Sequence, residues 1–308
     1  MLLILNSLLP IFAIITLGTV LKRIGWIDDT FIKTSDRLIY YIFFPCLLFW
    51  KIGNTSTTAG VEWTFILCAL SAVFVVFLLS LFFARLFRMP PYEVGSFSQS
   101  CYRFSTYIGM AIILSVLGAE GTRQFGILIG FLIPFINVLV VSTMIWFSGE
   151  NRHADHKTLT MLKATVSNPL IIACVAGIFY SGLGIPLPRF VDNALGLTSL
   201  LTLPLALISI GGSLTFASSR DHLGTAFVAA GFKLILLPLV GYTLMKTFQV
   251  SSTAFSVAMI YFALPTSPQG YILSSQLNSD VDLATTAIVL STLLSLIPLS
   301  IVLLMIAQ

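Results

Sequence analysis

The stretch ALPTSPQGYILSSQ, Ala263 to Gln276, lies inside a long apolar region, yet it contains two prolines, a glycine and two glutamines. Pro265 and Pro268 each lack a backbone N–H and clash with the carbonyl one turn earlier, so they interrupt a helix that would otherwise span a membrane. Backbone groups freed in this way are tolerated at membrane depth only where protein or water satisfies them. The stretch therefore predicts a broken helix that lines a cavity, with a kink used only for packing as the alternative.

The composition of the whole chain indicates an integral membrane protein. Of its 308 residues, 57% are hydrophobic and only 9% are charged, which leaves too little polar surface to cover a soluble exterior. The first apolar run has no basic residue before it and no small-residue cleavage site, so we interpret it as a span and not as a removable signal. The net charge of +4 comes from scattered loop residues. Their lack of a dense basic patch argues against a nucleic-acid partner.

Apolar runs of about 17 or more residues predict ten membrane spans. They lie at residues 3–21, 36–53, 63–84, 92–117, 123–147, 165–182, 191–216, 224–245, 252–277 and 282–306. Because the runs are continuous and do not alternate, they indicate helices and not the strands of a barrel. The fold class expected is an all-α membrane protein.

The basic residues indicate which way the chain enters the membrane. With the N-terminus outside, the inside connections carry ten of the sixteen Lys and Arg residues and the outside connections carry four. The positive-inside rule then places both termini outside. The two remaining cations, Arg103 and Lys233, lie at membrane depth.

The chain also matches itself at an offset of 159 residues. The offset pairs Pro10 with Pro169, Gly18 with Gly177, Gly25 with Gly184, Leu38 with Leu197, Pro45 with Pro204, and Gly53 with Gly212. Two repeats of five spans, residues 1–150 and 151–308, would enter the membrane from opposite sides because five is odd. Inverted repeats are typical of secondary transporters, although a duplication kept only for packing gives the same pattern.

In this repeat the fourth span aligns with the ninth, so that Phe104–Met110 lies over Pro268–Ser274. Interrupted helices at matching positions of two repeats indicate a substrate site. The sequence therefore predicts substrate contacts at Gln99, Arg103, Ser105, Thr106, Tyr107, Pro265, Pro268, Gln269 and Gln276.

The two intramembrane cations are expected to play different roles. A guanidinium binds a carboxylate through two parallel hydrogen bonds, so Arg103 is predicted to bind an anion. The alternative interpretation is that the fourth span starts later than residue 92, so that the Arg103 side chain reaches toward the inside surface. Lys233 has apolar neighbours, and we expect it to stabilise the crossing helices by meeting free carbonyls or half-helix C-termini.

No residue pattern supports catalysis, a metal or a cofactor. The segment HADH, His153 to His156, lies in the most polar loop and lacks a complete ligand set. The acidic residues fall in loops or at span ends, so no proton relay is expected. Nothing resembles a catalytic triad or a phosphate-binding glycine loop. The four cysteines, which we assign to packing, are Cys46, Cys68, Cys101 and Cys174.

Six segments together resemble the auxin efflux carrier family of membrane transporters, which includes bacterial members. They are residues 35–49, 102–112, 167–178, 203–214, 233–239 and 264–276. The resemblance implies ten helices with two crossing broken helices, spans 4 and 9, and a fold related to Na⁺/H⁺ antiporters and bile-acid transporters. The family often has Asn where this chain has Ser105, and the first crossover lacks the proline of the second.

The resemblance further implies an elevator motion of spans 3–5 and 8–10 against a scaffold of spans 1, 2, 6 and 7. The expected function is secondary transport of small organic anions: carboxylates, dicarboxylates such as malonate or malate, or auxin-like acids. A passive anion channel and a membrane-embedded sensor are the alternatives. The expected setting is a plasma membrane, the inner membrane in a bacterium, with a homodimer through the scaffold spans. In related crossover folds Na⁺ supplies the positive charge that we assign to Lys233.

Overall fold

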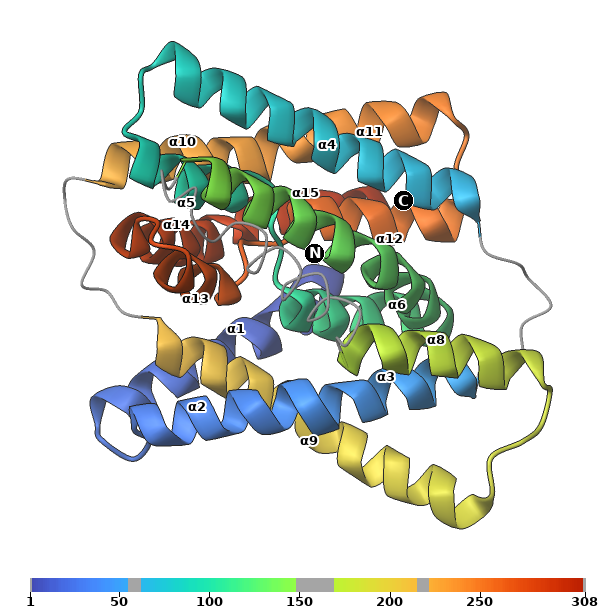
Figure 1. Ribbon diagram of the computed structural model, residues 1–308. Helices are drawn as coiled ribbons and strands as arrows, with labels where there is room; N and C mark the ends of the chain where they lie inside the picture. Colours follow the sequence, from blue (N-terminus) through green and yellow to red (C-terminus); the bar gives the residue numbers. More distant parts are fainter. Residues whose placement is uncertain (1, 55–61, 148–168, 215–221, 307–308) are drawn as a thin grey trace. The chain divides into compact units, whose positions relative to one another are not determined.

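The computed structural model describes residues 2–54, 62–147, 169–214 and 222–306. Within these ranges all regular structure is helical and there is no strand, as the sequence predicts for the fold class. Figure 1 labels most of the helices. In the first half they are α1 (Leu2–Arg23), α2 (Asp29–Leu38), the π-helical turn η1 (Ile39–Phe43), α3 (Phe44–Gly53), α4 (Trp63–Leu86), α5 (Pro91–Tyr102) and α6 (Thr106–Phe147).

The second half continues the same pattern of apolar helices with short breaks. It contains α8 (Pro169–Gly182), α9 (Arg189–Ser213), α10 (Leu223–Gly231), the π-helical turn η3 (Phe232–Leu236), α11 (Leu237–Thr247), α12 (Ser252–Ala263), α13 (Gln269–Gln276), α14 (Val281–Leu294) and α15 (Leu296–Ile306). Helix α6 is interrupted at Gly118, whose φ of 62° and ψ of −146° are not helical. The interruption falls where the sequence predicts the boundary between the fourth and fifth spans.

Local sequence signals explain several helix starts. Asp28 precedes α2, and its carboxylate accepts a hydrogen bond from the backbone N–H of Phe31 at 2.7 Å. Asp280 precedes α14 and accepts from the N–H of Leu283 at 2.8 Å. Such caps satisfy N–H groups that have no partner within the helix. Helix α5 begins with Pro91. Proline has no backbone N–H, and at the first position of a helix that N–H would have no acceptor within the helix.

The described helices vary in whether they alone can cross a membrane. Four stretches are long and apolar enough, and a fifth candidate is a pair of helices bent by 41°. The four stretches are Trp63–Leu86, Pro91–Met144, Arg189–Ser213 and Leu223–Thr247, and the bent pair is Val281–Leu294 with Leu296–Ile306. The chain is thus a helical protein with several membrane-spanning candidates, while the count of ten spans stays a prediction.

The chain separates into two compact units that each draw on both halves of the sequence. Unit 1 contains Met1–Glu62, Tyr107–Phe131 and Val166–Ser213. Unit 2 contains Trp63–Thr106, Leu132–Thr165 and Leu214–Gln308. The units therefore do not coincide with residues 1–150 and 151–308, and the repeat boundary itself stays a prediction.

Within unit 1, α1 packs along α9 and α3 packs along α8. The α1 and α9 backbones approach closely: the hydroxyl of Thr19 donates to the carbonyl of Gly211 at 2.8 Å. Small residues at a contact allow this closeness in membrane helices. Gly25 and Gly184, which the 159-residue offset pairs, follow α1 and α8 with positive φ angles of 78° and 65°. Glycine adopts such angles without steric cost.

Within unit 2, α10 packs against α5 and α14, and α11 packs against α4 and α12. Aromatic rings fill part of this interior. The Phe97 ring lies 5.5 Å from the Phe83 ring and 6.0 Å from the Phe232 ring, measured between centroids. This packing joins α4, α5 and η3 in unit 2.

Candidate functional site

Two pairs of consecutive helices are separated by short breaks, and both breaks lie in unit 2. Helix α5 ends at Tyr102 and α6 begins at Thr106, whereas α12 ends at Ala263 and α13 begins at Gln269. The first residue of each break is extended in nearly the same way. Arg103 has φ −66° and ψ 148°, and Leu264 has φ −64° and ψ 148°.

The two breaks are hydrogen-bonded to each other. The backbone N–H of Ser105 donates to the carbonyl oxygen of Pro265 at 2.9 Å. The hydroxyl of Thr266 donates to the carbonyl of Ser100 at 2.9 Å, and its backbone N–H donates to the hydroxyl of Ser291 at 3.1 Å. Protein groups thus satisfy part of the backbone that the breaks release, which is the condition for irregular backbone at membrane depth.

Three buried polar atoms around the breaks have no hydrogen-bond partner among the described residues. They are the side-chain oxygens Gln99 Oε1, Ser105 Oγ and the hydroxyl of Tyr261. Gln99 is held in place because its Nε2 donates to the carbonyl of Gly270 at 2.9 Å and to the hydroxyl of Ser274 at 2.8 Å. Since an unsatisfied buried polar group costs about 1–3 kcal/mol, a ligand or water at these atoms would recover that energy.

Lys233 is completely buried in η3. Its ammonium donates to the carbonyl oxygen of Phe262 at 3.2 Å and lies 5.6 Å from the centroid of the Tyr261 ring. Phe262 is in the last turn of α12, where helix carbonyls carry partial negative charge. This is the kind of partner that we expected for Lys233, while its role in stabilising the crossover stays a prediction.

Most of the other predicted site residues also belong to unit 2. Arg103, which belongs to unit 2, is 8% exposed, so its side chain is buried. The structure brings the breaks that contain Arg103 and Pro265 into direct contact through the hydrogen bonds above. Within unit 2, Thr106, Pro268 and Gln269 are half-buried.

Two predicted residues are not placed with this group. Tyr107 belongs to unit 1, where its ring packs against the ring of Phe44 at 5.0 Å between centroids. Gln276 is the last residue of α13, and its side chain lies outside the described part of the structure. Both assignments stay predictions.

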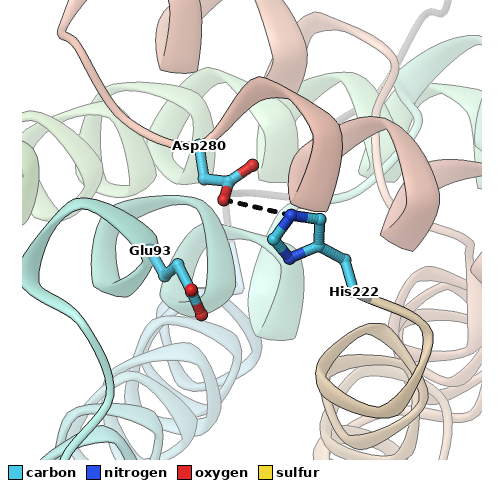
Figure 2. A group of neighbouring side chains, drawn as sticks. All are labelled: Glu93, His222 and Asp280. Carbon is cyan, nitrogen blue, oxygen red and sulfur yellow. Dashed lines mark ion pairs between the residues drawn. The ribbon is translucent and has the colours of Figure 1, made fainter. Parts of the chain in front are cut away.

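Unit 2 contains a second polar cluster that the sequence did not predict, since no metal ligands were expected. Glu93, His222 and Asp280 each direct one potential ligand atom to within 4.8 Å of the others. Figure 2 shows the three side chains, with the contact between His222 and Asp280 dashed. Asp280 is only 8% exposed although it lies in a connection between helices. No local spacing links the three residues, but each falls in a connection or helix start that the predicted topology places inside.

Comparison with known proteins identifies the family. The model of the Membrane transport protein family matches residues 3–303. An uncharacterized transporter of Methanothermobacter thermautotrophicus is 22% identical over 297 residues, which cover 96% of this chain and 95% of the relative. An uncharacterized transporter of Methanocaldococcus jannaschii is 20% identical over 302 residues, which cover 95% of each chain. The match confirms the transporter family that the auxin efflux carrier resemblance implied: the chain belongs to the Membrane transport protein family.

Proposed function

We propose that the protein is a secondary transporter of small organic anions that works by an elevator-type alternating-access motion. The observation that carries the proposal is the pair of hydrogen-bonded helix breaks in unit 2. Ser105 and Pro265 join the breaks, and side-chain oxygens of Gln99 and Ser105 that have no partner in the described part of the chain are buried beside them. Discontinuous helices that meet near the bilayer midplane form the substrate sites of many secondary transporters.

The electrostatics of the breaks favour an anion. Helices α6 and α13 begin directly after the two breaks, at Thr106 and Gln269. Helix N-termini carry partial positive charge and unsatisfied N–H groups, which bind carboxylates. Arg103 adds a full positive charge in the first break, and a guanidinium matches the geometry of a carboxylate. Carboxylates, dicarboxylates such as malonate or malate, and auxin-like acids all present such a group.

Two observations support an inverted repeat of ten spans with both termini outside. The pairing of α1 with α9 and of α3 with α8 is reciprocal, because the offset of 159 residues relates α1 to α8 and α3 to α9. The glycines after α1 and α8 share a positive φ. The topology predicts that Ala154, outside the described residues, and Ser181 face opposite sides. Impermeant cysteine labelling tests this in a background without native cysteines, and equal access from one face contradicts it.

The division into units supports the elevator motion. Unit 1 contains the segments of predicted spans 1, 2, 6 and 7, together with Tyr107–Phe131 from spans 4 and 5. Unit 2 contains spans 3, 8, 9 and 10, the first part of span 4 with the first helix break, and the second part of span 5. The units therefore divide spans 4 and 5 and agree only in part with the expected transport part of spans 3–5 and 8–10. A transport part that carries both breaks as one compact body is what an elevator requires. A passive channel would need no such body, and it would not show counterflow.

The experiment uses purified protein in liposomes loaded with malonate, malate or succinate. We expect saturable uptake of labelled substrate that internal anion accelerates by counterflow, and no uptake of neutral analogues. Arg103→Lys should weaken apparent affinity by roughly tenfold or more, because an ammonium does not reproduce bidentate binding. Arg123→Lys is the matched control: Arg123 is also 8% exposed, and it lies outside the breaks, in unit 1, where it pairs with Glu120 at 3.3 Å. Uptake that never saturates would favour the channel.

A further inference from the structure

Glu93, His222 and Asp280 converge from three helix starts within unit 2 (Figure 2). Glu93 is in the first turn of α5, His222 immediately precedes α10, and Asp280 immediately precedes α14. Helix α10 packs against both other helices. The cluster therefore lies where three helices of one compact body begin.

The backbone around the cluster fixes two of its members. The N–H of Asp280 donates to the carbonyl oxygen of Tyr92 at 3.0 Å, and the hydroxyl of Ser279 donates to the same oxygen at 2.7 Å. The Ser279 hydroxyl also accepts from the N–H of Ser96 at 3.1 Å. These bonds, one between backbone groups and two through the Ser279 hydroxyl, hold the start of α14 against the start of α5, where Asp280 and Glu93 lie.

The two oxygens of the Asp280 carboxylate make different contacts. One oxygen caps α14 by accepting from Leu283, while the other lies 3.5 Å from Nε2 of His222. That separation is longer than a good hydrogen bond between nitrogen and oxygen. Two ligand atoms that each lie about 2.1 Å from a tetrahedral zinc ion are roughly 3.4 Å apart, which matches it.

We propose that Glu93, His222 and Asp280 bind a divalent transition-metal ion such as Zn²⁺. The donor set consists of one imidazole and two carboxylates, and an imidazole selects Zn²⁺ over Mg²⁺ or Ca²⁺. A metal binds imidazole in its neutral form and carboxylates in their ionised form, so this donor set would offer two negative charges to a divalent ion. The cap bond to Leu283 orients the Asp280 ligand as outer hydrogen bonds do in known metal sites. Bound metal would tie together the starts of α5, α10 and α14.

The test is calorimetric titration of Zn²⁺ into purified full-length protein that has been treated with a chelator. We expect one ion per chain for the wild type and a loss of affinity of at least about tenfold in Glu93→Gln, His222→Gln and Asp280→Asn. Asn remains a good helix cap, so Asp280→Asn keeps the start of α14. Excess Mg²⁺ should not displace the ion, whereas equal competition by Mg²⁺ would refute the transition-metal assignment.

Two controls separate this cluster from other ligands. Asp282→Asn removes a carboxylate from the same first turn of α14 but lies outside the cluster, so it should bind Zn²⁺ like the wild type. The double variant His153→Gln, His156→Gln removes the other two histidines and should also bind normally. Loss of binding in either control, or unchanged binding in His222→Gln, would overturn the proposal.

A spectroscopic readout keeps the test decisive if one variant folds poorly. Co²⁺ substituted for Zn²⁺ should give visible absorption in the wild type, and its band positions should change when any one of the three ligands is removed. Zn²⁺ should also raise the thermal midpoint of the wild type and both controls but not of the ligand variants. A wild type that shows neither a cobalt spectrum nor a thermal shift would contradict the metal site. That result is expected if the three residues form only an ion pair.

Discussion

The ammonium of Lys233 donates a hydrogen bond to the carbonyl oxygen of Phe262, 3.2 Å away, inside unit 2. The carbonyls of the last turn of a helix have no partner within the helix, and α12 ends one residue after Phe262. A fully buried cation therefore meets the negative end of the half-helix that leads into the second break. This contact gives the buried ammonium of Lys233 a hydrogen-bond partner.

Replacing Lys233 with Met should lower the thermal stability of the protein without ligand. The variant leaves the Phe262 carbonyl without its donor, at an expected cost of about 1–3 kcal/mol. Lys246→Met, at an exposed position of α11, removes the same group as a control and should change stability little. The measurement is a thermal melt in detergent. An equal or higher midpoint for Lys233→Met would mean that the cost of burying the charge exceeds the value of the bond.

Transport by the wild type should not require Na⁺, because Lys233 already supplies a positive charge at the end of α12. Counterflow in liposomes with choline in place of Na⁺ tests this directly. A strict requirement for Na⁺ would contradict the lysine-for-sodium interpretation, while the anion-carrier proposal would stand.

Ser105→Ala and Ser98→Ala should differ in their effect on the stability of the free protein. The Ser105 hydroxyl is buried without a partner among the described residues, so its removal should leave the stability of the free protein unchanged or slightly higher. The Ser98 hydroxyl bonds to that of Ser80 at 2.8 Å, and its removal should cost about 1 kcal/mol.

The ligand response distinguishes the two serine variants. If Ser105 faces substrate, its alanine variant should lose part of the thermal shift that a dicarboxylate produces, whereas Ser98→Ala should keep it. Equal shifts in both variants would remove Ser105 from the substrate site. Thermal melts with and without malonate provide the comparison.

Pro265→Ala and Pro268→Ala should reduce transport more than they reduce folded yield. Alanine restores an N–H and favours a continuous helix by about 3 kcal/mol relative to proline, which works against the break between α12 and α13. Initial uptake rates normalised to the amount of monodisperse protein give the measurement. Wild-type rates in both variants would show that the prolines serve packing.

Gly18→Ala and Gly211→Ala should each destabilise unit 1. A Cβ at Gly211 would collide with the carbonyl oxygen of Ile15, and one at Gly18 would collide with that of Ile208. Overpacking costs about 1–3 kcal/mol, and backbone atoms yield less readily than side chains. Gly224→Ala is the control, because a Cβ there meets open space and should be neutral or stabilising. A thermal midpoint unchanged in Gly211→Ala would contradict the close approach.

The sequence predicts the second helix break better than the first. Pro265 and Pro268 predict the second break directly, because proline has no backbone N–H and its ring clashes with the preceding helical turn. The first break, which begins at Arg103, has no proline, and only its alignment with the second revealed it. Its cause is not local: the N–H of Ser105 bonds to Pro265, which lies 160 residues further along the chain.

Contacts between distant segments also explain what sequence reasoning missed. Glu93, His222 and Asp280 share no spacing that a single helix or loop would bring together, and only the packing of α5, α10 and α14 unites them. The two compact units interleave segments from both halves of the chain, so their boundaries depend on contacts between segments that are distant in sequence. All-helical structure was predictable because continuous apolar runs leave no other way to satisfy backbone groups in lipid.

The link between the breaks through the N–H of Ser105 and the carbonyl of Pro265 is made by main-chain atoms alone. Any residue except proline at position 105 keeps the donor. Mutation can thus exchange the side chain at position 105 while the hydrogen bond between the two breaks persists. Under the proposed function, the residue at position 105 is therefore a place where substrate preference can change without a change of fold.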